Sequence, residues 1–529
     1  MDRPRPGAFA GGIVLALALS PALAALAIYP GFVTQDGPSH LYNAHILARP
    51  AGSPLLEATF EVRRDPLPNW AGHLGLLGWL RVLPPRAADR AMSALTLVAL
   101  SASTYWLRLR VVGPGGAWVA ALWSALVGLN VAWLLGFQSF LLGAALLPVV
   151  LGTWWAGRGG IGGRRALGLG VLLICGYVCH LVSLGLTALG VVVLELSTPG
   201  PNRRRRAART AAALAVLVPL GLVYRSLMSR GGAIRPSWRL LSGPWTWRTW
   251  GAQLTWVDPI TLASKRLSPL GLAPGGWNGL LSPALWFAAG ASVLVLGSRP
   301  SRLNKSWLVL AAALLIGGVV CPDSLGPGHG DYLPQRVVLV GLVALLPALD
   351  LEGRRGPRYL GGGLLAGALA VQSAYVWGYA RRSDRLVEEY LAASAHLDRS
   401  VRVGTLFLGD LRGDYRANPL RHVDCLLGIG TDRVIWTNYE AAHYYFPVGY
   451  RPGLARPPEL EFEAIGILDN PADAAGRSRR WLDLLTKHHA QIDKLVTWGD
   501  DPGLDATTSR WFTPTFRGGR VRVWGRRPG

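Results

Sequence analysis

Charged side chains are scarce in this sequence and make up only 16% of its 529 residues, whereas soluble proteins of this size carry about 25%. The shortage is confined to the part before Arg381, where apolar runs alternate with short basic or Gly/Pro-rich breaks. After Arg381 the composition is ordinary. The sequence therefore predicts a polytopic α-helical membrane region over residues 1–380 and a soluble domain over residues 381–529.

Cysteine is also scarce, with four residues in the chain. Cys175 and Cys179 lie inside one apolar run, Cys321 lies at the end of another, and Cys425 lies in the soluble region. No CxxC pair is present, which argues against a zinc module of that kind, and the spacing does not suggest a disulfide framework.

Acidic residues are outnumbered by basic ones, 31 to 54, and the formal net charge is +23. Such a charge can indicate nucleic-acid binding, but many of these basic residues lie in short loops between apolar runs, where they determine membrane topology instead of forming one binding face. The apolar run after Arg3 and Arg5 is longer than the core of a signal peptide, so we expect a retained first helix.

About 20 apolar residues are needed to cross a bilayer. Eleven runs are candidates, at residues 8–29, 87–107, 117–135, 137–156, 166–181, 183–198, 208–228, 281–297, 307–321, 334–350 and 359–380. The segment 70–83 is shorter and is interrupted by glycines. We interpret it as an interfacial helix in a first outer loop over residues 30–86, with Trp70 and Trp79 at the membrane surface.

The loop arginines support this assignment. With the N-terminus in the cytoplasm, the cytoplasmic loops are the arginine-rich segments 108–116, 157–165, 199–209, 298–305 and 350–358. If residues 70–83 spanned the membrane, the four arginines at 203–206 would face outward, against the positive-inside rule. Eleven spans therefore place the C-terminal domain outside. The four-arginine run is best interpreted as a topology determinant, with anionic-lipid binding as the alternative.

Asp36, in the first outer loop, is the leading catalytic candidate. A carboxylate there could act as general base toward an acceptor hydroxyl. The alternative is helix capping, because Asp36 and Gly37 precede Pro38, a residue suited to a first helical turn. His40 would lie one turn further on and could orient the carboxylate or a phosphate. A metal is not favoured, because no third ligand stands at conventional spacing.

Further polar residues fall on the predicted outer side. Arg336, at the start of the tenth predicted span, could bind a phosphate with its planar guanidinium, or it could simply extend toward the membrane surface. His329 and Asp331 precede it. Gln138 and His180 are substrate-binding candidates or, as the favoured alternative, interhelical polar contacts. Four tryptophans are expected to form an interfacial belt in preference to a sugar-stacking platform: Trp245, Trp247, Trp250 and Trp256.

This layout resembles the GT-C superfamily of polyprenyl-phosphate-sugar-dependent membrane glycosyltransferases, including protein O-mannosyltransferases. The local runs DGPSHL at 36–41, GFQSFLLG at 136–143, and NYEA at 438–441 followed by YFPV at 445–448 look like those of poorly characterised bacterial relatives of that superfamily. The resemblance implies about 11–13 membrane helices, an acidic catalytic residue at Asp36 and a donor-phosphate arginine at Arg336. Many members carry a second adjacent acid where this chain has Gly37.

The resemblance further implies an inverting transfer from a lipid-phosphate sugar to an acceptor glycan, lipid or protein outside a bacterial inner membrane. Binding of nucleic acid is not expected. Two alternatives remain open: a transporter or lipid flippase, and a non-catalytic scaffold. Against transport, no inverted repeat and no charge at mid-helix depth is evident.

The sequence of the C-terminal region alternates between predicted strands and predicted helices. Strands are predicted at residues 401–409, 432–437, 491–498 and 520–524, and helices at 383–396 and 479–489. This pattern is typical of a small α/β domain with a partly parallel sheet. Four polar residues there could contact an acceptor, but a buried packing role is favoured: His422, Asp424, Tyr439 and Glu440.

Overall fold

The computed structural model describes residues 6–48, 52–159, 161–199, 203–231, 233–263, 304–326, 329–351, 355–408, 415–468 and 474–528. The chain forms two compact units. The first comprises Met1–Ala25, Pro66–Gly72 and Ser93–Gly378, and the second comprises Leu26–Asp65, His73–Met92 and Tyr379–Gly529. Each unit is described by itself below.

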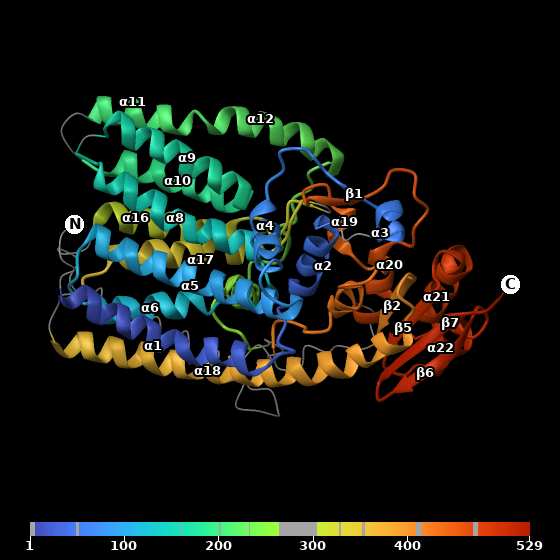
Figure 1. Cartoon of the computed structure of the whole chain (residues 1–529). Coiled ribbons are helices and arrows are strands. Elements are labelled where there is room, and N and C mark those ends of the chain that lie inside the picture. Colours follow the sequence, from blue (N-terminus) through green and yellow to red (C-terminus); the bar gives the residue numbers. More distant parts are fainter. Residues whose placement is uncertain are drawn as a thin grey trace. The chain divides into compact units, whose positions relative to one another are not determined.

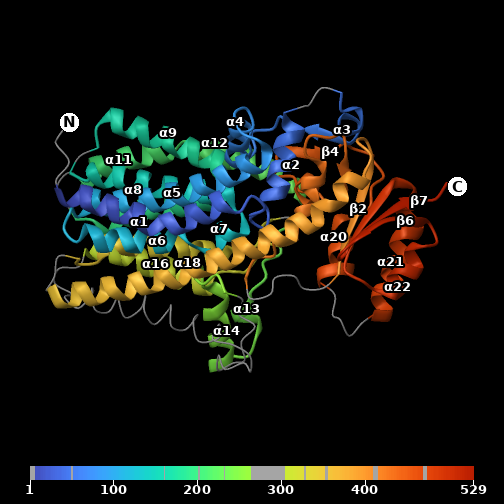
Figure 2. The ribbon, with the colours of Figure 1, turned by 60° about the horizontal axis from the view of Figure 1, so that its bottom comes forward.

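The first unit is a bundle of helices that lie side by side with roughly parallel axes (Figures 1 and 2). Its main helices are α1 (Pro6–Ile28), α5 (Pro85–Val111), α6 (Ala117–Gly128), α7 (Val131–Leu135), α8 (Gln138–Ala156), α9 (Gly163–Cys179), α10 (Leu181–Ser197), α11 (Arg203–Leu214), α12 (Leu217–Met228), α16 (Lys305–Val320), α17 (Leu333–Leu345) and α18 (Arg355–Leu391). Short helices α13 (Arg239–Ser242) and α14 (Trp247–Val257) follow α12 along the chain.

Five helices among the described residues are long and apolar enough to cross a membrane: Gly7–Ile28, Ala117–Leu135, Gln138–Ala156, Arg203–Met228 and Arg355–His396. Leu181–Ser197, Lys305–Val320 and Leu333–Ala348 are apolar but shorter. Helices cover each predicted span except 281–297, which lies outside the described residues. The polytopic helical class is confirmed, whereas the count of eleven spans and their orientation stay predictions. The segment 70–83 forms α4 (Trp70–Trp79), which is too short to span.

Glycines bring helices α16 and α17 close together. A Cβ on Gly318 would stand 2.5 Å from the Val338 side chain, and one on Gly341 would stand 2.9 Å from the Leu315 side chain. In a membrane, helices associate through close van der Waals packing and interhelical hydrogen bonds, so small residues at the contact are favoured. This contact fixes the start of α17, which carries Arg336.

The second unit contains a five-stranded mixed sheet. Its strand order is β3-β2-β5-β7-β6, from β2 (Arg402–Phe407), β3 (Val434–Ile435), β5 (Lys494–Trp498), β6 (Phe512–Gly518) and β7 (Val521–Arg526). Strand β2 pairs in parallel with β3 and β5, while β7 pairs antiparallel with β5 and β6. The sheet is thus partly parallel, as the alternation of strands and helices indicated.

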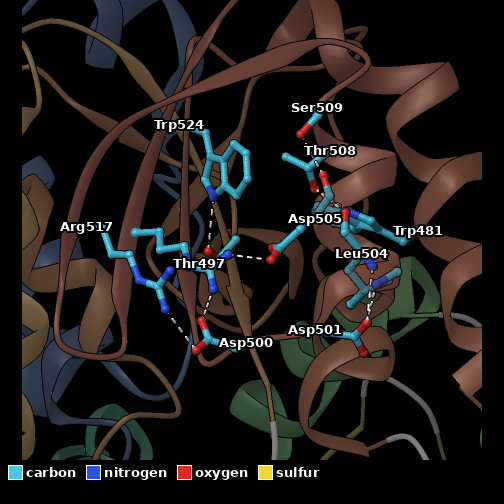
Figure 3. Close-up of polar contacts among 12 residues, drawn as sticks. Trp481, Thr497, Asp500, Asp501, Leu504, Asp505, Thr508, Ser509, Arg517 and Trp524 are labelled. Atoms are coloured by element: carbon cyan, nitrogen blue, oxygen red, sulfur yellow. Dashed lines mark hydrogen bonds and ion pairs between the residues drawn. The ribbon is translucent and has the colours of Figure 1, made fainter.

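Polar contacts tie helices α21 (Ala474–His488) and α22 (Pro502–Thr508) together and link α22 to the sheet (Figure 3). The indole of Trp481 donates to Thr508 Oγ1 at 2.9 Å. Asp501 caps α22 by accepting from two backbone amides, and Arg522 on β7 pairs with Asp500 and Asp505. These contacts connect α21, α22 and β7.

The structure of this region differs from the prediction in two elements, one helix that was predicted and one strand that was not. The helix predicted at 383–396 is no separate element, because α18 continues without a break to Leu391 and is followed by a 3-10 turn over Ala392–His396. Strand β6 was not predicted at all. It contains Pro514 at the edge of the sheet, where a missing amide donor is tolerated.

Residues Leu26–Asp65 fold together with the C-terminal residues. Strand β1 (Phe60–Val62) pairs antiparallel with β4 (Val448–Tyr450). The Tyr42 hydroxyl, on α2 (Gly37–Leu47), donates to Arg433 O at 2.7 Å, and Asp432 accepts from the first amides of α3 (Pro54–Thr59). The unit therefore draws on three stretches of chain, where the sequence suggested residues 381–529 alone. That this region is soluble and extracytoplasmic stays a prediction.

Candidate functional site

Asp36 stands at the N-terminal end of α2, with Gly37 and Pro38 in the first turn as the sequence suggested. Its side chain makes no capping hydrogen bond, although its backbone carbonyl accepts from the His40 amide at 3.1 Å. The carboxylate is largely buried, with Asp36 9% exposed. Capping alone therefore does not explain this residue, and its carboxylate is available for another role.

His422 lies against Asp36 within the second unit. The distance from His422 Nε2 to Asp36 Oδ1 is 3.7 Å. Burial lowers the pKa of His422, and the nearby Asp36 carboxylate opposes that shift. His422 also lines a small pocket of about 280 Å³, together with Thr405, Phe407, Arg421, Thr437, Phe462 and Glu463. His422, which lies beside the candidate base Asp36, thus borders a pocket lined by polar and aromatic groups.

A second buried carboxylate, from Asp89 on α5, lies beside the start of α2. A Cβ on residue 37 would stand only 2.8 Å from Asp89 Oδ1. The side chain of any larger residue would therefore collide with Asp89, which explains glycine at this position. A carboxylate from a different helix thus lies beside Gly37.

His40, one turn along α2 from Asp36, faces a buried glutamate. His40 Nδ1 lies 2.7 Å from Glu440 Oε1, and His73 Nε2 on α4 lies 2.7 Å from Glu440 Oε2. Glu440, on α19 (Tyr439–Ala442), is fully buried. Burial alone would lower the pKa of His40, but Glu440 more than reverses this and raises it to about 9. The two imidazoles hold the pKa of Glu440 well below its usual range against the effect of its burial.

These three side chains form a cluster that the sequence did not predict. Their ligand atoms all lie within 4.8 Å of one another. A metal was not favoured from the sequence, because Asp36 and His40 had no third ligand at conventional spacing, and in the folded chain His40 instead lies beside His73 and Glu440. Glu440 was expected to pack, and His73 was not singled out. No sequence signal joins the two, because they come from elements hundreds of residues apart.

In the first unit, Arg336 and His180 come together as two of the predicted substrate-binding residues. Arg336 Nη1 lies 3.0 Å from His180 Nε2. The guanidinium stacks over the rings of Phe137 and Phe140, at 4.6 and 5.1 Å from their centroids. Such stacking fixes the plane of the guanidinium and therefore the direction of its N–H groups.

His180 contacts Arg336 through one ring nitrogen and the start of α10 through the other. Arginine has no acceptor, so Arg336 Nη1–H donates to His180 Nε2. His180 Nδ1 lies 3.1 Å from the Val182 amide nitrogen at the start of α10. A guanidinium oriented in this way suits an anion with several acceptor oxygens.

The remaining predicted residues occupy separate positions. Gln138 is buried as the first residue of α8. His329 and Asp331 lie in the turn before α17, where the His329 amide donates to Gly326 O at 3.0 Å. Asp323, which was not singled out, accepts from the Trp256 indole at 2.9 Å and from the Arg239 amide at 2.9 Å.

The tryptophans of the predicted belt divide into two groups. Trp245 and Trp247 are exposed, at 65% and 64%. Trp256 instead stacks on Tyr332 and lies beneath the Arg239 guanidinium. Asp36 and His40 lie in the second unit, and Arg336 lies in the first. That the three residues converge on one site stays a prediction.

No family model and no curated protein matches this chain. Solved structures do match. ArnT from Cupriavidus metallidurans, in the apo state, has a TM-score of 0.54 at 12% identity, with 98% of each chain covered. The same protein bound to undecaprenyl phosphate gives a TM-score of 0.53 at 12% identity, with 98% of this chain and 99% of that chain covered.

The arabinofuranosyltransferase AftD from Mycobacteria gives a TM-score of 0.50 at 16% identity over 97% of this chain. This chain spans 40% of the length of AftD. ArnT and AftD are both glycosyltransferases of the GT-C superfamily. At these identities the likeness concerns the fold, and it extends over nearly the whole chain. The protein therefore has the fold of the GT-C membrane glycosyltransferases.

Proposed function

We propose that this protein is a membrane glycosyltransferase that transfers a sugar from a polyprenyl-phosphate-linked donor to an acceptor on the extracytoplasmic side. Asp36 is the general base. The observation that carries the proposal is the buried Asp36 carboxylate, which stands at the start of α2 without capping it. The likeness in fold to ArnT bound to undecaprenyl phosphate supports the class of donor.

The reaction requires little from the protein beyond positioning and proton transfer. An acceptor hydroxyl oxygen attacks the anomeric carbon of the sugar, and the bond from that carbon to the donor phosphate oxygen breaks. Asp36 takes the hydroxyl proton, and polyprenyl phosphate leaves with the bonding electrons. Attack from the face opposite the phosphate inverts the anomeric configuration. A positioned base contributes roughly 10²–10⁴-fold to such a step.

Arg336 and His180 are the residues proposed to bind the donor phosphate. The guanidinium is held over Phe137 and Phe140 and donates to His180 Nε2, so the imidazole orients the N–H groups of the guanidinium. Charge-assisted hydrogen bonds of this kind are roughly twice as strong as neutral ones. They also stabilise the additional negative charge that the phosphate acquires as it leaves.

The test is sugar transfer by the purified full chain in lipid nanodiscs, supplied with a panel of radiolabelled polyprenyl-phosphate sugars and cell-envelope acceptors. Asp36→Asn keeps the size of the side chain and removes the base, so transfer should fall by about 10²–10⁴-fold. Asp65→Asn, in the same predicted outer loop, is the matched control and should retain wild-type transfer.

Two results would overturn the proposal. Unchanged transfer by Asp36→Asn would remove the base assignment. An absence of transfer by the wild type with every donor, together with normal binding of polyprenyl phosphate, would favour a scaffold or a lipid flippase. Lipid movement between the leaflets of reconstituted vesicles, measured by quenching of a labelled polyprenyl phosphate, separates those two.

A further inference from the structure

We propose that His40, His73 and Glu440 bind a single divalent transition-metal ion, for which Zn²⁺ is the best match. The inference concerns the second unit alone and does not depend on the transfer reaction. It rests on three buried side chains of metal-binding type, from α2, α4 and α19, that meet at one point.

The donor atoms fit such an ion in type. Two imidazole nitrogens and one carboxylate form a His₂Glu set, which is an established zinc ligand set. Calcium and magnesium prefer shells made of oxygen, so two imidazoles disfavour them. Imidazole also binds copper, iron and nickel, and metal availability helps decide which is bound.

The donor atoms also fit in position. Each imidazole nitrogen lies 2.7 Å from a different oxygen of Glu440, and the whole set lies within 4.8 Å. Ligand atoms bound to one zinc ion at about 2.0–2.1 Å stand roughly 3.3 Å apart when the geometry is tetrahedral. Small side-chain rotations would therefore bring all three atoms to bonding distance of a common centre, with no movement of the helices.

The charges around the cluster favour a cation. Three carboxylates act on His40: Glu440 in contact, and Asp36 and Asp89 at longer range. A buried charge is stabilised by a partner of opposite sign, so these carboxylates would attract an ion of charge +2 at the centre of the cluster. Phe446 closes one side, with its ring centroid 6.2 Å from that of His40 and 6.0 Å from that of His73.

The ion would connect segments that are distant in the chain. His40 and His73 come from the segment after the first helix, and Glu440 comes from the C-terminal part. Metal binding to ligands assembled only by folding adds directly to folding free energy. It would also fix α2 and with it the position of Asp36, one turn before His40.

The first experiment measures metal content. The full chain is purified in detergent without chelators, its affinity tag is removed, and metals are quantified by mass spectrometry. We expect about one zinc per chain. After dialysis against a chelator the melting temperature should fall, and it should recover on addition of Zn²⁺. Co²⁺ in place of Zn²⁺ should give the visible absorption of a four-coordinate site with nitrogen and oxygen ligands.

Variants locate the ion. His73→Ala and Glu440→Gln should each lose the bound zinc and the chelator-sensitive part of the melting temperature. His45→Ala is the matched control, since it lies on the same helix as His40 and its Nε2 faces the Thr431 carbonyl. If Glu440→Gln does not fold, His73→Asn serves as the milder second variant, and only monodisperse fractions are compared.

The proposal fails on either of two outcomes. Wild-type protein that contains less than about 0.1 metal ion per chain and does not respond to Zn²⁺ holds a metal-free acid–base cluster instead. Equal zinc in wild type and folded His73→Ala places the ion elsewhere.

Discussion

Two histidine sites in this protein differ in the charge that they face. In the second unit, His40 and His73 both face the carboxylate of Glu440. In the first unit, His180 faces the guanidinium of Arg336 between aromatic rings. Both sites are removed from bulk water, so the partner charge determines what each imidazole can do.

The difference explains why one site suits a cation and the other an anion. Beside a carboxylate, an imidazole takes up a proton or binds a metal. Beside an arginine, an imidazole stays neutral and accepts an N–H, which orients the guanidinium toward an anion. The same residue type therefore serves opposite charges in the two units. The four predictions below test this contrast.

Removal of Glu440 should have the largest effect. Glu440→Ala leaves two buried imidazoles without their carboxylate, and breaking a buried charged contact costs about 3–5 kcal/mol. The measurement is the free energy of unfolding in detergent. Glu388→Ala is the control, because Glu388 forms an exposed ion pair with Arg86. The Glu388 side chain is 49% exposed and that of Arg86 is 41% exposed, so loss of this pair should cost no more than about 1 kcal/mol of unfolding free energy. If both variants lost the same free energy of unfolding, the buried carboxylate of Glu440 would not have the special role that separates its site from that of His180.

Asp424 is a buried acid that accepts hydrogen bonds from hydroxyl and amide groups. Burial raises its pKa from the usual 3.8 to about 6, against hydrogen bonds from Thr437 and Thr405. The folded state thus binds the proton more tightly, so its stability falls as the pH rises from 3.8 to 6 and then levels off.

Asp424→Asn should therefore stabilise the protein at pH 7.5 by up to about 3 kcal/mol and change little at pH 4. Melting curves of the two proteins across this pH range give the comparison. A destabilised variant at pH 7.5 would mean that Asp424 is charged and has a cationic partner, as Glu440 has.

Arg336→Lys tests the anion site at an intermediate magnitude. Lysine keeps the charge but loses the planar fork that stacks on Phe137 and Phe140. Binding of polyprenyl phosphate should weaken by about tenfold, since one good hydrogen-bonded contact to a charged group is worth about 1.5 kcal/mol. Arg239→Lys, over the ring of Trp256, is the control. Unchanged affinity for Arg336→Lys would remove the phosphate assignment.

The smallest effect is expected for Phe140→Leu. The Phe140 ring lies under the Arg336 guanidinium. It also packs against His180, with the two ring centroids 5.5 Å apart. Loss of a cation–π contact of about 0.5–1 kcal/mol should weaken polyprenyl phosphate binding by roughly two- to fivefold. Phe9→Leu, on an exposed face of α1, should leave binding unchanged. A loss larger than that of Arg336→Lys would mean that the ring itself touches the lipid.

The sequence predicted those features that depend on local pattern. Apolar runs of sufficient length gave the helices, and Pro38 gave the start of α2 beside Asp36. The alternation of strands and helices gave a partly parallel sheet. Arg336 and His180 were both chosen as polar residues at helix ends, and the structure brings them together.

Features that depend on contacts between distant segments were missed. The Asp89 carboxylate lies beside Gly37 from another helix, and nothing in the sequence near either residue indicates this. Glu440 was assigned to packing because a single acid in an α/β region has no local signature. Strand β6 was missed because Pro514 argues against a strand, and its edge position, which removes the objection, is a property of the folded sheet.

The pairing of residues Leu26–Asp65 with the C-terminal part has a consequence for biosynthesis. Asn43 donates to Asn438 at 2.8 Å across a separation of 395 residues. At the usual rates of translation, roughly 20–80 s pass between the synthesis of these two partners. During that interval Asp36, His40 and His73 have been made but Glu440 has not. A nascent or truncated chain can thus insert its helices while its candidate catalytic centre is still incomplete, so activity would appear only with the final segment.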